Sequence, residues 1–206
     1  MLLELCTLDD VLAYPGMSGV SDQDAPWLVQ LVRGFSQRAE SWTDRWLHRE
    51  SRTEYFNTGV YQCALQLKAF GHSASTITTV HEDFSRVFGT STLVAATGYR
   101  FDYLTGMLTR DYQSWFSGRG VVRVVYDGGL GLTTEDVPAD LRMAATMQCA
   151  FWYQRRNDLG VVQRTTQGGA LSLSQPSKLL PEVEEILGVY RMHSLFGGTD
   201  QRSGVG

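Results

Sequence analysis

The chain has 206 residues, of which 43% are hydrophobic and 19% charged, and this suits one globular domain of mixed secondary structure. A formal net charge of -4 excludes a surface built to grip nucleic acid, because such a surface needs clustered excess lysine and arginine. The three scattered cysteines indicate a reducing compartment, and the lack of a signal sequence or a long apolar run predicts a protein made in the cytoplasm without a membrane partner.

The first predicted helix covers Thr7–Tyr14, with Thr7 as its N-cap and Asp10 as the carboxylate of a capping box. A second, longer helix begins at Trp27, because large apolar residues then recur at steps of three and four. Its apolar side is expected to pack in the core of a helical bundle. The predicted core residues are Leu31, Phe35, Trp42 and Trp46. These N-terminal helices occupy residues 7–50.

The composition changes after residue 52 to short β-branched and aromatic stretches separated by glycines. The stretches that indicate strands are RTEYFNTG (52–59), ALQLKAFG (64–71), STITTVHED (75–83), TLVAATGYRFDY (92–103), GMLTR (106–110) and RGVVRVVYDGG (119–129). We expect a β-rich insertion over 52–126, folded as antiparallel hairpins or a small sandwich. The predicted fold class is therefore α+β: a small helical bundle with an inserted antiparallel β-rich region, all within a single domain.

A third helix is predicted over 138–157, entered at Asp136 and stopped by Gly160. Its apolar residues occupy an arc wider than one stripe, so the helix needs cover on more than one side. The predicted core residues are Leu141, Ala145 and Trp152. Arg155 and Arg156 lie in the last turn, where positive charge complements the helix dipole. The pattern permits two interpretations. The favoured one is a central core helix with solvated arginines, and the other is a core helix that also uses part of its wide apolar face against a neighbouring subunit.

The remaining chain predicts one more helix and a tail. Residues 161–176 are expected to form a loop or loose hairpin. A closing helix over Pro181–Arg191 has proline at its start and acidic residues in its first turn, so the C-terminal helices span 137–191. Residues 193–206 hold glycine and polar residues with little to bury, which predicts a flexible tail.

No spacing in the chain is typical of a catalytic or cofactor site. The histidines are isolated, without an HExxH pattern or a paired cysteine. His81, Glu82 and Asp83 are adjacent, but neighbouring strand residues point to opposite faces, so we expect no metal there. The glycines over 128–131 lack the lysine of a phosphate loop and fit a turn after a strand. The sequence predicts no enzyme and no cofactor, although distant residues can still meet in a fold.

Four segments carry a resemblance when they are taken in order. They are TLDDVLAY (7–14), LVRGFSQRAESWTDRWLHRESRTEYFNTG (31–59), VVRVVYDGGLG with VPADLRMAA (121–131 and 137–145), and LLPEVEEILGVYR (179–191). Their order and spacing resemble the head-tail connector, or adaptor, proteins of long-tailed bacteriophages and related gene-transfer particles. The resemblance covers most of the chain from 7 to 191, and the β-rich middle over 60–115 departs most from it.

The resemblance implies a structural virion protein at the head-tail interface. Copies would form a homo-oligomeric ring, a dodecamer, beneath the portal protein and would join the DNA-filled head to a stopper or tail-completion protein. Double-stranded DNA would pass through without specific binding, which a mildly acidic chain permits. The residues expected at subunit or partner boundaries are Arg155, Arg156, Arg191, His193, Leu195 and Phe196. The glycine-rich tail is expected to order only on docking to a partner.

Two other functions stay open at this point. In the first, the β-rich region of a tail or baseplate component binds a host glycan by stacking exposed aromatic residues on sugars. The aromatic residues proposed for this role are Tyr99, Tyr103, Tyr112 and Trp115. In the second, the chain is a small hydrolase whose catalytic residues assemble only in three dimensions, for which no nucleophile motif gives support.

Overall fold

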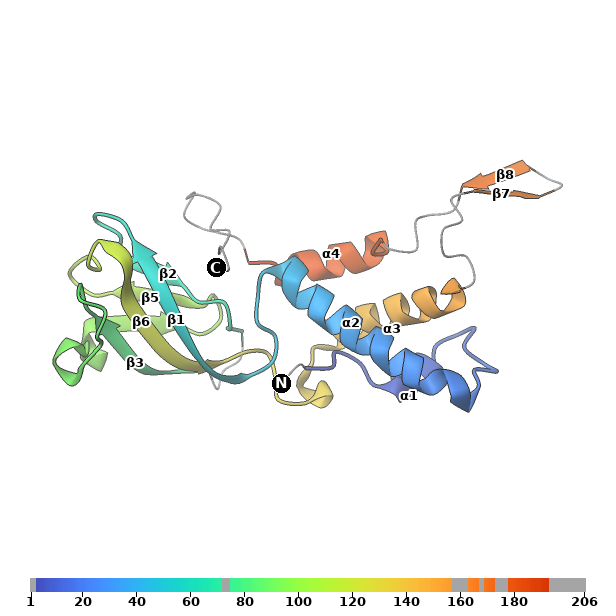
Figure 1. Ribbon diagram of the computed structural model, residues 1–206, viewed down its shortest axis with the longest axis horizontal. Helices are drawn as coiled ribbons and strands as arrows, with labels where there is room; N and C mark the ends of the chain where they lie inside the picture. Colours follow the sequence, from blue (N-terminus) through green and yellow to red (C-terminus); the bar gives the residue numbers. More distant parts are fainter. Residues whose placement is uncertain (1–2, 72–74, 157–162, 167–168, 173–177, 193–206) are drawn as a thin grey trace.

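The helices of this chain gather at one end of an elongated molecule and most of its strands gather at the other (Figure 1). This computed structural model describes residues 3–71, 75–156, 163–166, 169–172 and 178–192. For 163–166 and 169–172 it describes the backbone, and for the other residues it describes the side chains as well. The arrangement confirms the predicted α+β class, because helices and antiparallel strands occupy separate parts of the chain.

The helical module is built around one central helix. Its members are α1 (Leu8–Leu12), α2 (Ala25–Thr43), α3 (Ala139–Gln154) and α4 (Pro181–Tyr190). Helix α3 packs against each of the other three, so its wide apolar arc is covered from several sides within the monomer. None of the described helices combines the length and hydropathy that crossing a bilayer requires.

Local signals set where the first two helices begin and end. The predicted capping box of α1 is confirmed: Thr7 Oγ1 accepts from the Asp10 N–H at 3.0 Å and Asp10 Oδ2 accepts from the Thr7 N–H at 2.8 Å. Helix α2 ends before Asp44, which has a left-handed backbone with φ of 51°. The expectation that this helix continues to Trp46 is therefore wrong.

The entry to α3 also differs from the expectation. Asp136 closes its own capping box with Thr133 around a short 3₁₀ helix, η4 (Thr134–Asp136), and so does not cap α3. The N-cap of α3 is Pro138, whose extended backbone starts the helix without a side-chain cap. Two separate turns thus replace the single capped start, because the carboxylate bonds to the N–H groups closest to it.

Two three-stranded antiparallel sheets form the β module. One has the order β1 (Glu50–Thr58), β6 (Gly118–Gly128), β3 (Thr76–Glu82), and the other has the order β2 (Ala64–Gln66), β5 (Met107–Arg110), β4 (Tyr99–Asp102). Each predicted β stretch contributes one of these strands, although β2 and β4 are shorter than their stretches. The long strand β6 pairs with both β1 and β3, so its alternating valines form the middle of the module.

Each module has its own apolar core. The helical core includes Leu5, Val11, Leu28, Phe35, Leu141, Ala145, Val183 and Leu187, and the β core includes Leu65, Leu67, Val80, Leu108, Trp115, Val122, Val124 and Tyr126. The predicted core residues Leu31, Trp42 and Trp152 are partly buried at the margin of the helical core. Trp46 packs instead against the β core, because the chain has already left α2 at this point.

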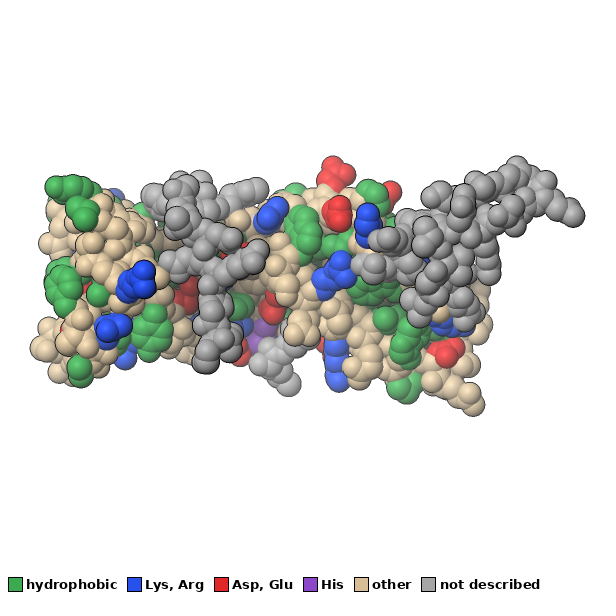
Figure 2. Space-filling view, turned by 45° about the horizontal axis from the view of Figure 1, so that its top comes forward, with side chains coloured by type: hydrophobic (Ala, Val, Ile, Leu, Met, Phe, Trp, Pro, Cys, Tyr) green, Lys and Arg blue, Asp and Glu red, His purple; other side chains and the backbone are tan. Residues whose placement is uncertain are grey.

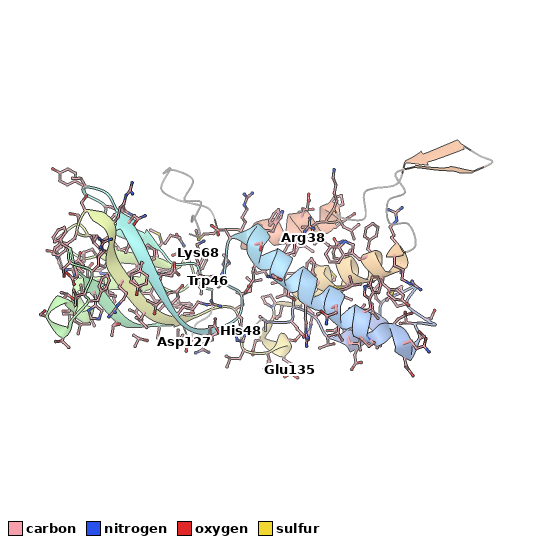
Figure 3. The ribbon with its side chains drawn as sticks, viewed as in Figure 1. Arg38, Trp46, His48, Lys68, Asp127 and Glu135 are labelled. Carbon is pink, nitrogen blue, oxygen red and sulfur yellow. The ribbon has the colours of Figure 1, made fainter. Side chains whose placement is uncertain are left out.

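The two modules meet where α2 leads into β1 and β6 leads into η4. His48 forms an isolated parallel bridge with Gly131, and Arg49 pairs with Asp127 at 3.0 Å. Trp46, His48, Lys68 and Asp127 lie around this junction in Figure 3. Gly129 has φ of 137°, and a Cβ there would lie 2.6 Å from the backbone of Arg49, so the predicted glycine turn is required by close approach of two chain segments.

The residues between α3 and α4 include an antiparallel hairpin, β7 (Gln163–Thr166) and β8 (Gly169–Ser172). It projects from the helical end in Figure 1 and matches the predicted loose hairpin. It forms a sheet of two strands only, separate from the β module.

Candidate functional site

Three loops meet at the end of the β module that lies farthest from the helices. Strand register shows this: the pairs Thr58↔Gly118 and Glu82↔Val122 bring the ends of β1 and β3 to the start of β6. The opposite end of β6 pairs with the start of β1, beside the junction. The loops over 59–63, 83–92 and 111–117 therefore share the distal end.

Apolar side chains are exposed at this distal end. Tyr61 is 86% exposed and Phe84 is 64% exposed, and Val60 and Phe116 are also accessible. Figure 2 shows green hydrophobic side chains, with blue basic ones among them, over the end of the β module. We call Val60, Tyr61, Phe84 and Phe116 the distal aromatic surface. The rings of Phe84 and Phe116 stack at 4.6 Å between centroids and 8° between planes, so two different loops form one continuous apolar face.

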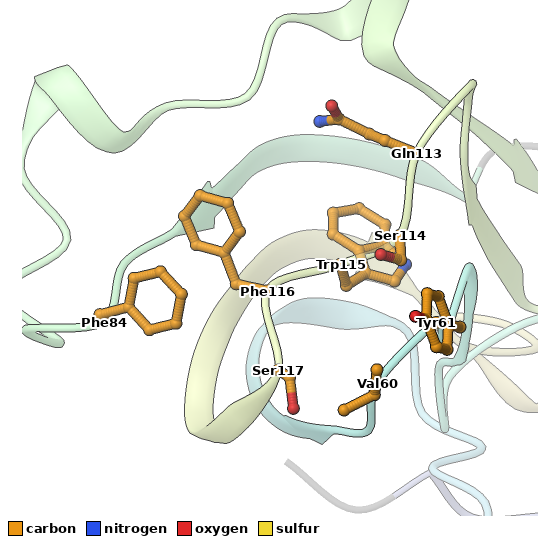
Figure 4. A pocket seen from close by; sticks show the side chains of 8 residues that line it. All are labelled: Val60, Tyr61, Phe84, Gln113, Ser114, Trp115, Phe116 and Ser117. Atoms are coloured by element: carbon orange, nitrogen blue, oxygen red, sulfur yellow. The ribbon is translucent and has the colours of Figure 1, made fainter.

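The distal aromatic surface borders a hollow of about 410 Å³ (Figure 4). The remaining lining residues are Gln113, Ser114, Trp115 and Ser117. Trp115 is only 2% exposed and closes the hollow from inside. Its indole N–H has no hydrogen-bond acceptor among the described residues. A buried donor without an acceptor is costly, so the fold keeps this ring buried at the expense of one unmade hydrogen bond.

A buried ion pair holds the loop over 111–117 in place. Arg110 Nη2 and Glu82 Oε2 lie 2.9 Å apart with both side chains largely buried. The other Glu82 oxygen accepts from the Phe116 N–H at 3.0 Å, and the Arg110 guanidinium lies 5.3 Å from the ring of Trp115. Thr58 also donates its hydroxyl hydrogen to the Phe116 carbonyl. These contacts keep Phe116 facing outward although water would favour a turned-in ring.

The backbone of the distal loops is unusual. Tyr61, Arg86, Phe88 and Tyr112 all have positive φ, between 55° and 63°. Bulky residues rarely adopt this left-handed conformation, and each such residue costs on the order of 1–3 kcal/mol. Four of the five non-glycine residues with positive φ in the described chain lie in these loops. Strain concentrated at one surface is typical of a site that is shaped for contact rather than for stability of the monomer.

Asp83 organises the second distal loop. Its Oδ1 accepts from the Ser85 N–H at 2.8 Å and the Ser85 hydroxyl at 2.6 Å, and its Oδ2 accepts from the N–H groups of Val87 and Phe88 at 2.9 and 2.8 Å. The hydrogen bond from the Ser85 side chain, with those from the backbone, lowers the pKa of Asp83 to about 2. The carboxylate therefore acts as the anchor that orients Phe84.

Replacing Asp83 by alanine is expected to open this loop. Amide hydrogen exchange at Val87 and Phe88 should accelerate by about tenfold or more, because both N–H groups lose their acceptor. In the unchanged protein the stabilisation from Asp83 is present above its ordinary pKa of 3.8 and is lost as pH falls through about 2. Asp102→Ala is the matched control, since Asp102 caps a turn at the other end of the module. Unchanged exchange in the Asp83 variant would contradict the anchoring role.

The structure does not bring together the basic residues predicted at a boundary. Arg156 stacks 3.9 Å above the ring of Tyr153, at the end of α3 beside the start of α2. Arg155 follows the same end of α3. Arg191 lies 5.4 Å from the ring of Trp42, near the end of α2. Arg156 and Arg191 therefore lie at opposite ends of α2. A rise of about 1.5 Å per residue places these two ends roughly 20 Å apart. The remaining predicted boundary residues, His193, Leu195 and Phe196, and the tail over 193–206 lie outside the described residues.

The aromatic residues proposed for a glycan do not form one surface. Trp115 was expected to be exposed but is buried, which corrects that expectation, and Tyr99 is partly buried against the β core. Tyr103 and Tyr112 are exposed, but they follow opposite ends of the β4–β5 hairpin. A large aromatic ring is more stable in the apolar core of the β module than in water, and this explains the burial of Trp115.

The adjacent acidic and histidine side chains at the end of β3 each have separate partners. His81 Nδ1 lies 3.3 Å from Thr92 Oγ1, whereas Glu82 and Asp83 make the contacts described above. Burial, with the charge of Arg123, lowers the pKa of His81. Within the described part of the chain, no group of three or more His, Cys, Asp or Glu side chains is placed to hold a metal ion.

Comparisons with known proteins agree with this architecture. The family model described as head completion protein matches residues 4–193. No curated protein sequence matches the chain. A chain in the neck of an empty GTA particle, computed with C6 symmetry, has a TM-score of 0.62 at 17% identity, and the match covers 94% of this chain and 93% of that chain.

Two further solved structures have a similar fold. A chain in the virion of a native gene transfer agent (GTA) particle has a TM-score of 0.61 at 19% identity, with 96% of this chain and 93% of that chain covered. A chain in the neck of a native GTA particle, computed with C12 symmetry, has a TM-score of 0.54 at 18% identity, with 96% and 98% covered. Both modules are therefore parts of one recurring fold.

Proposed function

Because the chain belongs to the head completion protein family, we propose that its copies form a ring below the portal of a phage-like particle and join the DNA-filled head to the stopper or tail. The observation that carries this proposal is the extent of the family match, which includes both modules and the junction between them. A structural role in joining head and tail follows from the family itself. The position below the portal and the contact with a stopper or tail-completion protein are our proposal.

The ring is proposed to contain twelve copies. The similar chains come from particle necks computed with C6 and C12 symmetry, and both symmetries suit a ring around a channel. In a ring, one face of each subunit must meet a different face of the next.

The channel of this ring is proposed to let double-stranded DNA pass without specific binding. Tight binding would require many lysine and arginine contacts to phosphate, and the whole chain has a formal net charge of -4. We propose no catalytic step and no cofactor. The charge balance supports this conduit role, because DNA must slide past the protein during packaging and ejection.

Native mass spectrometry tests the proposal with the purified full chain, alone and mixed with the portal protein encoded in the same genome. The expected result is one discrete complex with twelve copies of the chain per portal ring. A chain that stays unassociated with the portal at high concentration and low salt would overturn the proposal. A discrete complex with another copy number would overturn only the dodecamer.

Reversing Arg155 and Arg156 to glutamate is expected to weaken portal-dependent ring assembly by about tenfold or more, as buried or rim charges do at protein interfaces. The fold should lose about 1–2 kcal/mol, because Arg155 lies 5.3 Å from the Phe151 ring and Arg156 both stacks on Tyr153 and donates to its carbonyl, all at the end of α3. Native mass spectrometry measures assembly, and circular dichroism measures the melting temperature. Arg38→Glu with Lys178→Glu, two exposed basic residues, is the control. A large fall in melting temperature would make the two arginines structural instead.

A further inference from the structure

We propose that the distal aromatic surface is a docking site for an extended acidic segment of another neck protein, which inserts one apolar side chain into the hollow. This inference rests on the proposed function for the setting, a particle neck. It adds the surface that is used, the chemistry of the partner segment and the residues that recognise it. The carboxylates of the segment would lie against Arg86 and Arg119.

The first argument is the apolar area left in water. Phe84 and Phe116 stack on each other, yet both remain exposed, and Val60 and Tyr61 extend the same face across the hollow. A contiguous apolar patch with a polar rim is typical of a protein contact. The β core could have taken these side chains only by losing the loop contacts that hold Phe116 outward.

The second argument is the hollow and its unused donor. A volume of about 410 Å³ has room for a large side chain but is small for a folded surface, so an extended segment fits it best. Trp115 is almost wholly buried, and its indole N–H lacks an acceptor among the described residues. Once the side chains that cover this nitrogen move aside, a carbonyl or carboxylate oxygen of an inserted segment would satisfy the donor.

The third argument is the charge around the patch. Arg86 and Arg119 are exposed and make no ion pair with a described carboxylate. The two acidic residues of the distal loops are already occupied, since Asp83 accepts four hydrogen bonds and Asp111 pairs with Arg100 at 3.1 Å. Asp83 keeps its negative charge at neutral pH, but Arg86 and Arg119 outnumber it, so the rim of the patch carries one net positive charge. An acidic partner is complementary to it.

The charge does not favour a nucleic acid in this place. A phosphate backbone is held by many cations along its length, and the region from 50 to 128 has as many acidic as basic residues. Two arginines beside an open hollow lined by aromatic and polar side chains suit a short acidic peptide with an apolar anchor. The left-handed backbone at Tyr61 and Arg86 presets the loops for such a contact, which lowers the ordering cost on binding.

The test places a photoreactive p-benzoylphenylalanine at Phe84 of the full chain in assembled particles. After irradiation, mass spectrometry identifies the peptide attached to this position. The expected product is a segment of another neck protein that has net negative charge and an apolar residue at the attachment site. An adduct with a second copy of this chain, with DNA or with a neutral or basic segment would overturn the proposal, as would complete particles without an adduct.

A second labelling position keeps the test valid if the chain labelled at Phe84 does not fold. Val87 is 78% exposed on the same loop, so the label there reports on the same surface without disturbing the Phe84–Phe116 stack. Arg86→Glu with Arg119→Glu is expected to reduce the adduct by about tenfold or more. The control pair Arg38→Glu with Lys178→Glu, both exposed in the helical module, should leave it unchanged. An adduct that survives the reversal of both distal arginines would exclude charge recognition.

The outcome separates this inference from the proposed function. Ring formation with the portal is measured on purified proteins, whereas the adduct is measured in mature particles. Normal portal rings with no acidic adduct would refute the docking site alone. Absence of portal rings would refute the proposed position in the neck, and the identity of the adduct would then report the true partner of the surface.

Discussion

Replacing Arg45 by alanine is expected to lower the free energy of unfolding by about 3 kcal/mol and to separate the unfolding of the two modules. Arg45 is 6% exposed and follows α2 at the junction. One guanidinium nitrogen donates to the Tyr190 carbonyl at the end of α4 at 3.2 Å, and another donates to the Phe70 carbonyl in the β module. A single side chain therefore connects three parts of the fold.

The charge of Arg45 explains why its loss should be large. Burial lowers its pKa to about 10, so the side chain is still charged at neutral pH. Two carbonyl oxygens and the face of Phe70, 3.6 Å from the guanidinium carbon, replace the lost water. Alanine would remove these donors and leave both carbonyls without hydrogen-bond partners. The free energy lost in this way exceeds the free energy gained because the guanidinium charge is no longer buried.

Urea unfolding followed by tryptophan fluorescence and by far-ultraviolet circular dichroism measures this effect. The expected result is one shared transition in the unchanged protein and two non-coincident transitions in the Arg45 variant. Arg38→Ala, an exposed arginine on α2, should change stability by less than about 0.5 kcal/mol. A single unshifted transition in the Arg45 variant would show that the modules are joined by other contacts.

Tyr126→Phe is expected to cost about 2–3 kcal/mol, because one hydroxyl satisfies two buried groups. Tyr126 is fully buried on β6, and its hydroxyl donates to Glu54 Oε1 and accepts from the Ala69 N–H at 3.1 Å. Glu54 Oε1 also accepts from the Lys68 N–H at 3.0 Å. Tyr55→Phe on the neighbouring strand is the control, since Tyr55 is exposed. An equal effect of the two substitutions in chemical denaturation would contradict the buried network.

The same network predicts a dependence on pH. Burial raises the pKa of Glu54 above its ordinary value of 4.5, and the hydrogen bonds from Tyr126 and Lys68 oppose this rise only in part. The folded protein then holds this proton more tightly than the unfolded chain. The contribution of Glu54 is therefore full below 4.5 and is lost as pH rises through the folded pKa.

Glu54→Gln should remove this part of the pH dependence, because the amide oxygen accepts hydrogen bonds but does not titrate. Tyr126→Phe should extend the loss of stability to higher pH, since Glu54 then lacks the donor that lowers its pKa. Unfolding free energies measured across mildly acidic pH for the three proteins provide the comparison. Parallel curves for the unchanged protein and Glu54→Gln would contradict a raised pKa.

Local patterns in the sequence predicted most of the helices and strands and indicated the family. The Thr7 cap and the β-branched run around Val124 each depend on neighbours in the chain, and the structure has them as expected. The resemblance to connector proteins, drawn from four ordered segments, is confirmed by the family match over residues 4–193. Where a local competitor existed, the expectation was wrong: Asp136 bonds to the turn before α3 rather than to α3 itself.

The distal aromatic surface was not visible in the sequence. Phe84 and Phe116 are 32 positions apart, and their stacking depends on the end of β3 lying beside the start of β6. The local signals are isolated aromatic residues between turn residues, in GVYQ around Tyr61 and DFSRVFG around Phe84 and Phe88. Strands that pack in a core produce the same pattern. Trp115 is the opposite case: the sequence pattern predicted an exposed ring, but the ring is buried in the core of the β module.

The sequence by itself therefore determined the α+β class, the position of each module along the chain and the family, because capping, periodicity and turn residues act over a few positions. Only the tertiary structure decided that Arg45 joins the modules, that Trp46 belongs to the β core and that three distant loops form one apolar surface. These features arise from strand register and from burial, and both depend on residues far apart in the chain.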